Sequence, residues 1–150
     1  MNEMKTEKTV TEKEITIRLD DVAADAGTSV SLRRGWEADT IPSGGGTVMP
    51  RSDGSRARRM MRAAFALEAA AVTRRISPWM AGTADSDALT VKTMANESFA
   101  SLLEGLLRET IASAVVARMS ESARHPLAAS DREKADLAME RLVTLFTPRP

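Results

Sequence analysis

The stretch that decides the fold is MANESFASLLEGLLRETIASAVVARM, residues 94–119. Its apolar residues recur every three or four positions, a spacing that places them on one face of an α-helix. Proline is absent from the stretch, and Asp85 and Asp87 lie just before it. Acidic side chains favour the positive end of a helix dipole. The sequence therefore predicts a helix from about 87 to 119, which is long for a globular protein.

Shorter helices are predicted on both sides of the long one. Residues 56–76 carry an apolar residue at every third or fourth position. This helix ends before Pro78, because proline disfavours helical geometry in the preceding residue. The third helix, 130–146, opens with Ser130 and a glutamate three residues later, the pattern of a capping box. Together these helices predict an all-α segment over residues 55–150.

Residues 1–54 are predicted to form a largely disordered tail. The first 14 residues are rich in charge and show no apolar periodicity, as is typical of disorder. Residues 15–19 alternate apolar and polar side chains and favour a short strand or turn. Residues 41–54 contain four glycines and two prolines, a composition that indicates a linker. The domain boundary is therefore placed near residue 55.

Composition excludes several kinds of chemistry. The chain has no cysteine, so it can form neither disulfides nor thiolate metal sites. Its single histidine, His125, stands before a proline, with no metal-ligand spacing around it. The glycines at 44–46 lack the Lys-Ser/Thr sequence of a phosphate-binding loop. We expect no catalytic residue, metal ion, cofactor or small-molecule substrate.

Neither a signal peptide nor a membrane helix is expected. The first residues are polar and charged, unlike a secretory signal. No apolar run approaches the roughly 18 residues that a membrane helix requires. We therefore expect an intracellular protein.

Charge is balanced overall but unevenly spread. The formal net charge is zero, yet residues 1–55 carry seven basic and ten acidic side chains. Residues 56–75 contain six arginines and a single acid, Glu68. The uniformly basic composition of a free-standing nucleic-acid binder is missing. The arginine block is therefore the electrostatic feature to explain.

The order of a short, a long and a short helix in residues 55–150 resembles the histone fold. The resemblance is to neutral-charge members such as centromere protein S and the histone-fold subunits of general transcription factors. Such a chain leaves its long helix exposed and folds by pairing with a second helical chain, as a heterodimer or homodimer. The resemblance implies a non-enzymatic subunit of a chromatin, centromere or transcription assembly, located in the nucleus.

Two sets of residues follow from this interpretation. The apolar helix faces are expected to contact the partner chain through Phe65, Val72, Phe99, Leu103, Leu106, Ile111, Leu142 and Phe146. Proteins of this family that bind DNA do so through first-helix N-termini and paired loops. The resemblance therefore implies contacts with the DNA backbone by Arg58, Arg59, Arg62, Arg74, Arg75 and Arg124.

A second interpretation concerns the N-terminus. Residues 13–21 resemble the opening strand of ribbon-helix-helix repressors, in which paired strands enter the major groove. The overlapping residues 21–31 resemble the helix-turn-helix of Lac-type repressors. Either resemblance implies a small bacterial-type DNA-binding regulator, located in the cytoplasm, with a helical dimerisation domain. The two motifs overlap, so they are alternatives to each other.

Overall fold

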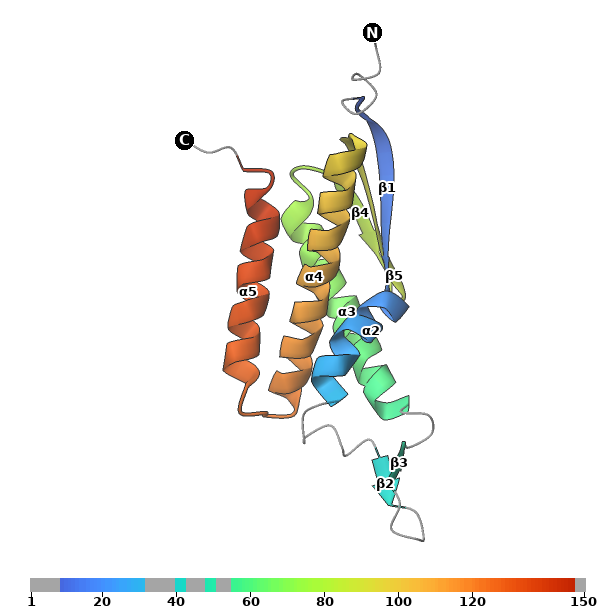
Figure 1. Cartoon of the computed structure of the whole chain (residues 1–150), viewed down its shortest axis with the longest axis vertical. Coiled ribbons are helices and arrows are strands. Elements are labelled where there is room, and N and C mark those ends of the chain that lie inside the picture. The colour runs from blue at the N-terminus through green and yellow to red at the C-terminus, as the bar shows by residue number, and fades with distance from the viewer. Residues whose placement is uncertain (1–8, 32–39, 43–47, 51–54, 148–150) are drawn as a thin grey trace.

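The computed structural model describes residues 9–31, 40–42, 48–50 and 55–147. An antiparallel sheet lies along one side of the molecule, and the helices lie against one face of it (Figure 1). The elements in chain order are β1 (Thr11–Arg18), α2 (Leu19–Ser31), β2 (Thr40–Pro42), β3 (Val48–Pro50), α3 (Ser55–Ile76), β4 (Ala81–Ala84), β5 (Ala88–Ala95), α4 (Glu97–Ser122) and α5 (Ala128–Thr144). Among the residues that the structure describes, strands β2 and β3 pair only with each other.

The main sheet has the strand order β1-β5-β4 and is antiparallel throughout. Ile15 and Ile17 on β1 lie opposite Val91 and Leu89 on β5, and all four side chains are buried. The alternate positions on both strands are polar or exposed, because successive side chains in a strand point to opposite faces. One face of the sheet therefore belongs to the core and the other faces solvent.

Helix α4 is the centre of the helical layer. It contacts α2, α3, α5 and strand β1, so it is buried on several sides over its second half. Helix α5 returns antiparallel to α4 as the outermost element (Figure 1). The largest fully buried side chains come from every layer: Ile17, Val22, Phe65, Val72, Ile76, Leu89, Val91, Leu103, Leu107, Ile111, Met119 and Leu142. The core is thus completed within the chain.

Small residues join α4 to α5. Ala114 and Ala117 of α4 cluster with Ala135 of α5, and small side chains allow the two helices to approach closely. The Thr110 hydroxyl donates to the Ala138 carbonyl oxygen at 3.3 Å. The predicted capping box is wrong: α5 begins earlier, at residue 128, and no side chain caps it.

The predicted fold class, an all-α histone-like arrangement, is wrong. The helix predicted over 56–76 is present as α3, but residues 81–95 form a β-hairpin between α3 and α4. Residues 88–95 alternate inward and outward side chains as a strand does. The apolar residue Met94, which fitted a helical stripe, instead lies exposed on β5.

Local hydrogen bonds explain where the hairpin ends and the helix starts. The Asp85 carboxylate accepts two backbone N–H groups of the hairpin turn at 2.7 and 2.8 Å, and these bonds lower the pKa of Asp85. The side-chain oxygen of Asn96 accepts the N–H of Phe99 at 2.8 Å and caps α4. Asp85 therefore stabilises a turn, and the helix begins about ten residues later than predicted.

The N-terminal residues that are described belong to the fold and are not a disordered tail. The short strand predicted at 15–19 overlaps β1, which pairs with β5 of the same chain. Helix α2 continues through Gly27, so residues 21–31 form one helix and not a helix-turn-helix. The side chains of Val22 and Ala26 are buried and pack α2 against the core. The linker predicted at 41–54 lies mostly outside the described residues.

Candidate binding groove between α3 and α4

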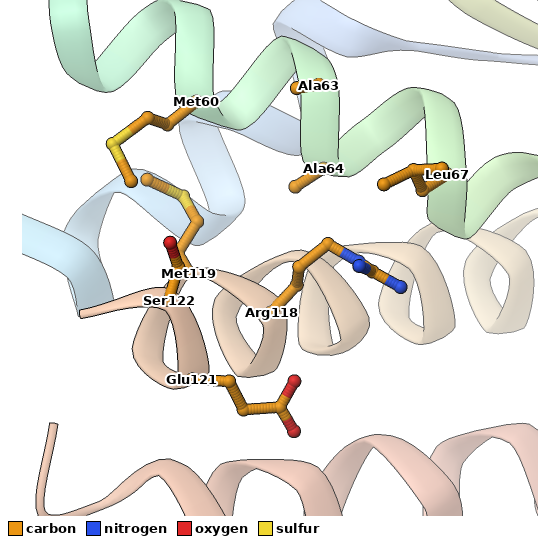
Figure 2. Close-up of a pocket in the computed structure, with 8 residues that line it drawn as sticks. All are labelled: Met60, Ala63, Ala64, Leu67, Arg118, Met119, Glu121 and Ser122. Atoms are coloured by element: carbon orange, nitrogen blue, oxygen red, sulfur yellow. The ribbon is translucent and has the colours of Figure 1, made fainter. Parts of the chain in front are cut away.

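A groove of about 430 Å³ runs between α3 and the C-terminal part of α4. Figure 2 shows its lining side chains, which come from these two helices alone. They are Met60, Ala63, Ala64 and Leu67 on α3, and Arg118, Met119, Glu121 and Ser122 on α4. In the part of the chain that the structure describes, no helix is both long and apolar enough to cross a membrane.

The α3 side of the groove is an apolar row on that helix. Met60, Ala63, Ala64 and Leu67 are spaced i, i+3, i+4 and i+7, which places them together on one face. Ala64 is buried in the same core as Phe65 and Val72, and Met60 packs against that core. Ala63 is exposed, and Leu67 is 54% exposed. The α3 side of the groove therefore begins at the edge of the core and extends to two exposed apolar residues.

A chain of charged side chains borders the groove and connects three helices. The Glu68 carboxylate of α3 is 8% exposed and accepts a hydrogen bond from Nε of Arg118 at 2.6 Å. Arg132 of α5 lies 3.9 Å from the same carboxylate. Arg132 also donates two hydrogen bonds to Glu121 of α4, at 2.8 and 2.9 Å. The network fixes α3, α4 and α5 relative to one another.

Hydrogen bonding within this network changes the acidity of its members. The bonds from Arg132 lower the pKa of the Glu121 carboxyl, and the same contact raises the pKa of Arg132. A second buried polar contact lies nearby, where the Ser120 hydroxyl donates to Asp131 at 2.7 Å. Both residues are buried in the α4–α5 interface. The carboxylates of this region therefore serve to hold helices together.

The lowered pKa of Glu121 predicts a pH effect. In the unfolded chain this carboxyl has its ordinary pKa near 4.5, so the native contact favours the charged form. Its stabilising contribution is fully present above that pH and is lost as the pH falls through the lowered native pKa. Because Glu121 is 43% exposed, the contribution is about 1 kcal/mol or less at neutral pH.

This effect can be measured with Glu121→Gln by urea unfolding. The variant should be less stable than the wild-type chain at pH 7, and the difference should shrink as the pH falls from 4.5 through the lowered native pKa, because the wild-type carboxyl then becomes protonated too. A difference that stays the same as the pH falls would show that packing, and not charge, accounts for the loss.

The six arginines predicted to bind DNA are not brought together. Arg58 pairs with Asp20 at 2.8 Å, and Arg62 pairs with Asp87 at 3.3 Å. The remaining four make no ion pair among the described residues, and they lie apart: Arg59 near the start of α3, Arg74 and Arg75 in its last turn, and Arg124 in the α4–α5 turn. Helix geometry separates the two ends of this set by about 25 Å. A single arginine surface is therefore not formed.

The residues predicted to contact a partner chain are instead packed within this one. Five of them are fully buried in the core: Phe65, Val72, Leu103, Ile111 and Leu142. Phe99, Leu106 and Phe146 are partly buried against the same core. Phe146 stacks on Trp79, with ring centroids 5.4 Å apart, and meets the edge of Phe99 at 5.8 Å. The apolar periodicity identified core residues correctly but could not say which chain covers them.

The residues predicted to contact a partner chain include none of the residues that line the groove. The signal for the α3 side was present in the sequence as the apolar Met60 and Leu67, which lie seven residues apart. His125 accepts the backbone N–H of Leu127 through Nδ1 at 3.1 Å, and no cluster of possible metal ligands occurs among the described residues.

Comparison with protein-family models, with curated proteins and with solved structures found no match.

Proposed function

We propose that this chain is a non-enzymatic protein-binding module whose α3–α4 groove receives an amphipathic helix of a partner protein. The single observation that carries the proposal is the apolar side of the groove on α3, where Leu67 is half exposed. Leu67 lies beside the exposed Ala63 and the partly buried Met60 on one face of α3, and contiguous apolar surface of this kind marks docking sites, whereas single exposed residues do not. The histone-type pairing is not part of this proposal, because the fold on which it depended is different.

The shape and chemistry of the groove favour a helix as the occupant. Ala63 and Ala64 leave room for a close approach by a helix backbone, as the alanines between α4 and α5 do. Met60 lines the groove and is only partly buried, and a flexible methionine adapts to the side chains of a partner. Met60 and Leu67 are about 10 Å apart along α3, which matches two turns of a bound helix with apolar residues at i, i+3 or i+4 and i+7.

Charge at the rim supports the same occupant. Arg118 is 43% exposed although its Nε binds Glu68, and Figure 2 shows its side chain extending between α3 and α4. The exposed part of this guanidinium suits an acidic residue on the polar side of a bound helix. A partner helix with an apolar face and a flanking Asp or Glu is therefore the segment that fits best.

Photo-crosslinking tests the proposal in cells that make the protein. A benzoylphenylalanine at position 67 should crosslink to a partner segment, and the sequence of the crosslinked peptide should have the apolar spacing of an amphipathic helix. The matched control is position 137, because Leu137 is 50% exposed but lies on the outer face of α5. Equal crosslinking of the same segment from both positions would contradict a role for the groove.

A synthetic peptide of the captured segment then tests the site with purified full-length chain. Ala63→Leu, which fills the groove from an exposed position, and Leu67→Lys should each weaken binding about tenfold or more. Leu137→Lys should leave binding unchanged. If Ala63→Leu binds the peptide normally, the groove is not the site. A further outcome would overturn the proposal that the groove binds a helix. This outcome is that the purified chain carries a small apolar molecule and the Ala63→Leu variant does not.

Nucleic acid is the other macromolecule to be examined. Titration of the same chain with duplex DNA at several salt concentrations measures whether it binds DNA through phosphate contacts, because the affinity of such contacts falls steeply as the salt concentration rises. Salt-dependent binding that is lost in Arg74→Ala/Arg75→Ala, with no peptide binding, would favour the DNA-binding alternative over the groove.

A further inference from the structure

Strand β1 is an edge strand of the main sheet. The strand order is β1-β5-β4, and within the described residues no strand pairs with the outer side of β1. It is eight residues long, twice the length of β4 at the other edge. An edge strand of this length offers a row of backbone N–H and C=O groups to another strand.

The hydrogen-bond pattern shows which groups are free. The Leu19 N–H donates to the Asp87 carbonyl oxygen at 2.7 Å, and this contact continues the register in which Arg18 faces Ala88. In an antiparallel pair, alternate residues form hydrogen bonds to the neighbouring strand. The odd-numbered residues of β1 therefore bond to β5. The N–H and C=O groups of residues 14, 16 and 18 point to the free edge.

Two features limit the pairing window to residues 14–18. Lys13 points inward, where its ammonium group binds Glu97 at 2.6 Å, and an inward charge at this point opposes extension of an edge. On the other side β1 ends at Arg18, and α2 begins at the next residue. The centre of the window is Thr16.

Charges within this window are self-complementary. Glu14 and Arg18 are both exposed on the solvent face of the sheet, and neither makes an ion pair among the described residues. Their positions are symmetric about Thr16. Opposite charges directly across a strand pair are stabilising, whereas like charges are destabilising.

We propose that two copies of this chain pair through β1 as antiparallel strands, with Thr16 opposite Thr16 of the second copy. In this register Glu14 faces Arg18 of the second copy, and the symmetry repeats this ion pair. Ile15 faces Ile17 of the second copy on the core side. The two three-stranded sheets become one six-stranded sheet. A shift that places Glu14 opposite Glu14 would set like charges against each other.

Charge reversal on the full chain tests the pairing by sedimentation velocity over a range of concentrations. Glu14→Arg places arginine opposite Arg18, and Arg18→Glu places glutamate opposite Glu14. Each variant should raise the dimer dissociation constant about tenfold or more. An equimolar mixture of the two variants should form a heterodimer, because each altered residue then meets an opposite charge. This recovery excludes misfolding as the cause of the losses.

Glu12→Arg is the matched control. It makes the same charge change on the same strand and face, but lies outside the proposed window, so the dimer should persist. A wild-type chain that remains monomeric at the highest concentration would overturn the proposal, as would dimers unaffected by Glu14→Arg. Loss of the dimer in Glu12→Arg alone would overturn the register.

Cysteine crosslinking gives an independent measurement, since the chain contains no cysteine of its own. Directly opposed hydrogen-bonded residues have Cα atoms about 5.5 Å apart, within the range of a disulfide. Thr16→Cys should therefore form a disulfide-linked dimer on mild oxidation. Thr83→Cys lies on the same sheet face at the β4 edge and should not. Crosslinking through Thr83→Cys alone would assign the dimer to the wrong edge and overturn the proposal.

Discussion

Replacing Phe65 with alanine is expected to lower the free energy of unfolding by about 3–5 kcal/mol. Phe65 is 0% exposed and lies in the main core of the chain. Its removal takes away a large buried apolar surface and leaves a cavity that the surrounding helices fill only in part. Urea unfolding followed by circular dichroism measures the loss.

Leu67→Ala is the control for this experiment. It lies two residues away on the same helix but is half exposed, so its loss should be about 1 kcal/mol or less. The Phe65→Ala loss should also be the same at low and high protein concentration, because the core that contains Phe65 is formed within one chain. A loss that depends on concentration would place Phe65 in an interface, as the histone-like interpretation predicted.

Replacing Arg118 with methionine is the second large effect, with an expected loss of about 2–3 kcal/mol. The variant keeps the length and packing of the side chain but leaves the buried Glu68 carboxylate without its 2.6 Å partner. Arg132, at 3.9 Å, compensates only in part. An uncompensated buried charge costs more free energy than the original pair contributed, because the carboxylate has lost its water.

A double variant separates this desolvation from packing. Glu68→Leu/Arg118→Met removes the buried carboxylate as well, so most of the lost stability should return. Thermal and urea unfolding of the two single variants and the double variant give the coupling energy. Arg141→Met is the control, since the Arg141–Glu109 pair is exposed and should contribute about 0.5 kcal/mol. If the double variant is less stable than Arg118→Met, the charge interpretation is wrong.

The helices could be predicted from the sequence where the pattern was purely local. The apolar spacing over 56–76 and the proline that follows it placed α3 almost to the residue. The long helix was also predicted, but its start was not, because Met94 fits a helical stripe as well as a strand position. Only the pairing of residues 88–95 with both β1 and β4 made this segment a strand and not the start of the helix.

The N-terminal region shows the limit of local patterns more clearly. Residues 15–19 carry a strand signal, but its partner lies more than 70 residues away in the sequence. A short strand is stable only when a neighbour satisfies its backbone groups. Glycine is a poor helix former, yet packing of Val22 and Ala26 against the core keeps α2 continuous through Gly27.

The sequence by itself determined that this chain is rich in helix, that a long helix ending near residue 119 supplies its central apolar face, and that cysteine chemistry is absent. The tertiary structure alone decided that the same face is covered by the sheet and by the helices of this chain. It also decided which apolar residues remain outside the core beside the groove. The physical reason is that periodicity identifies the side chains that avoid water, whereas the elements that shield them are set by long-range packing.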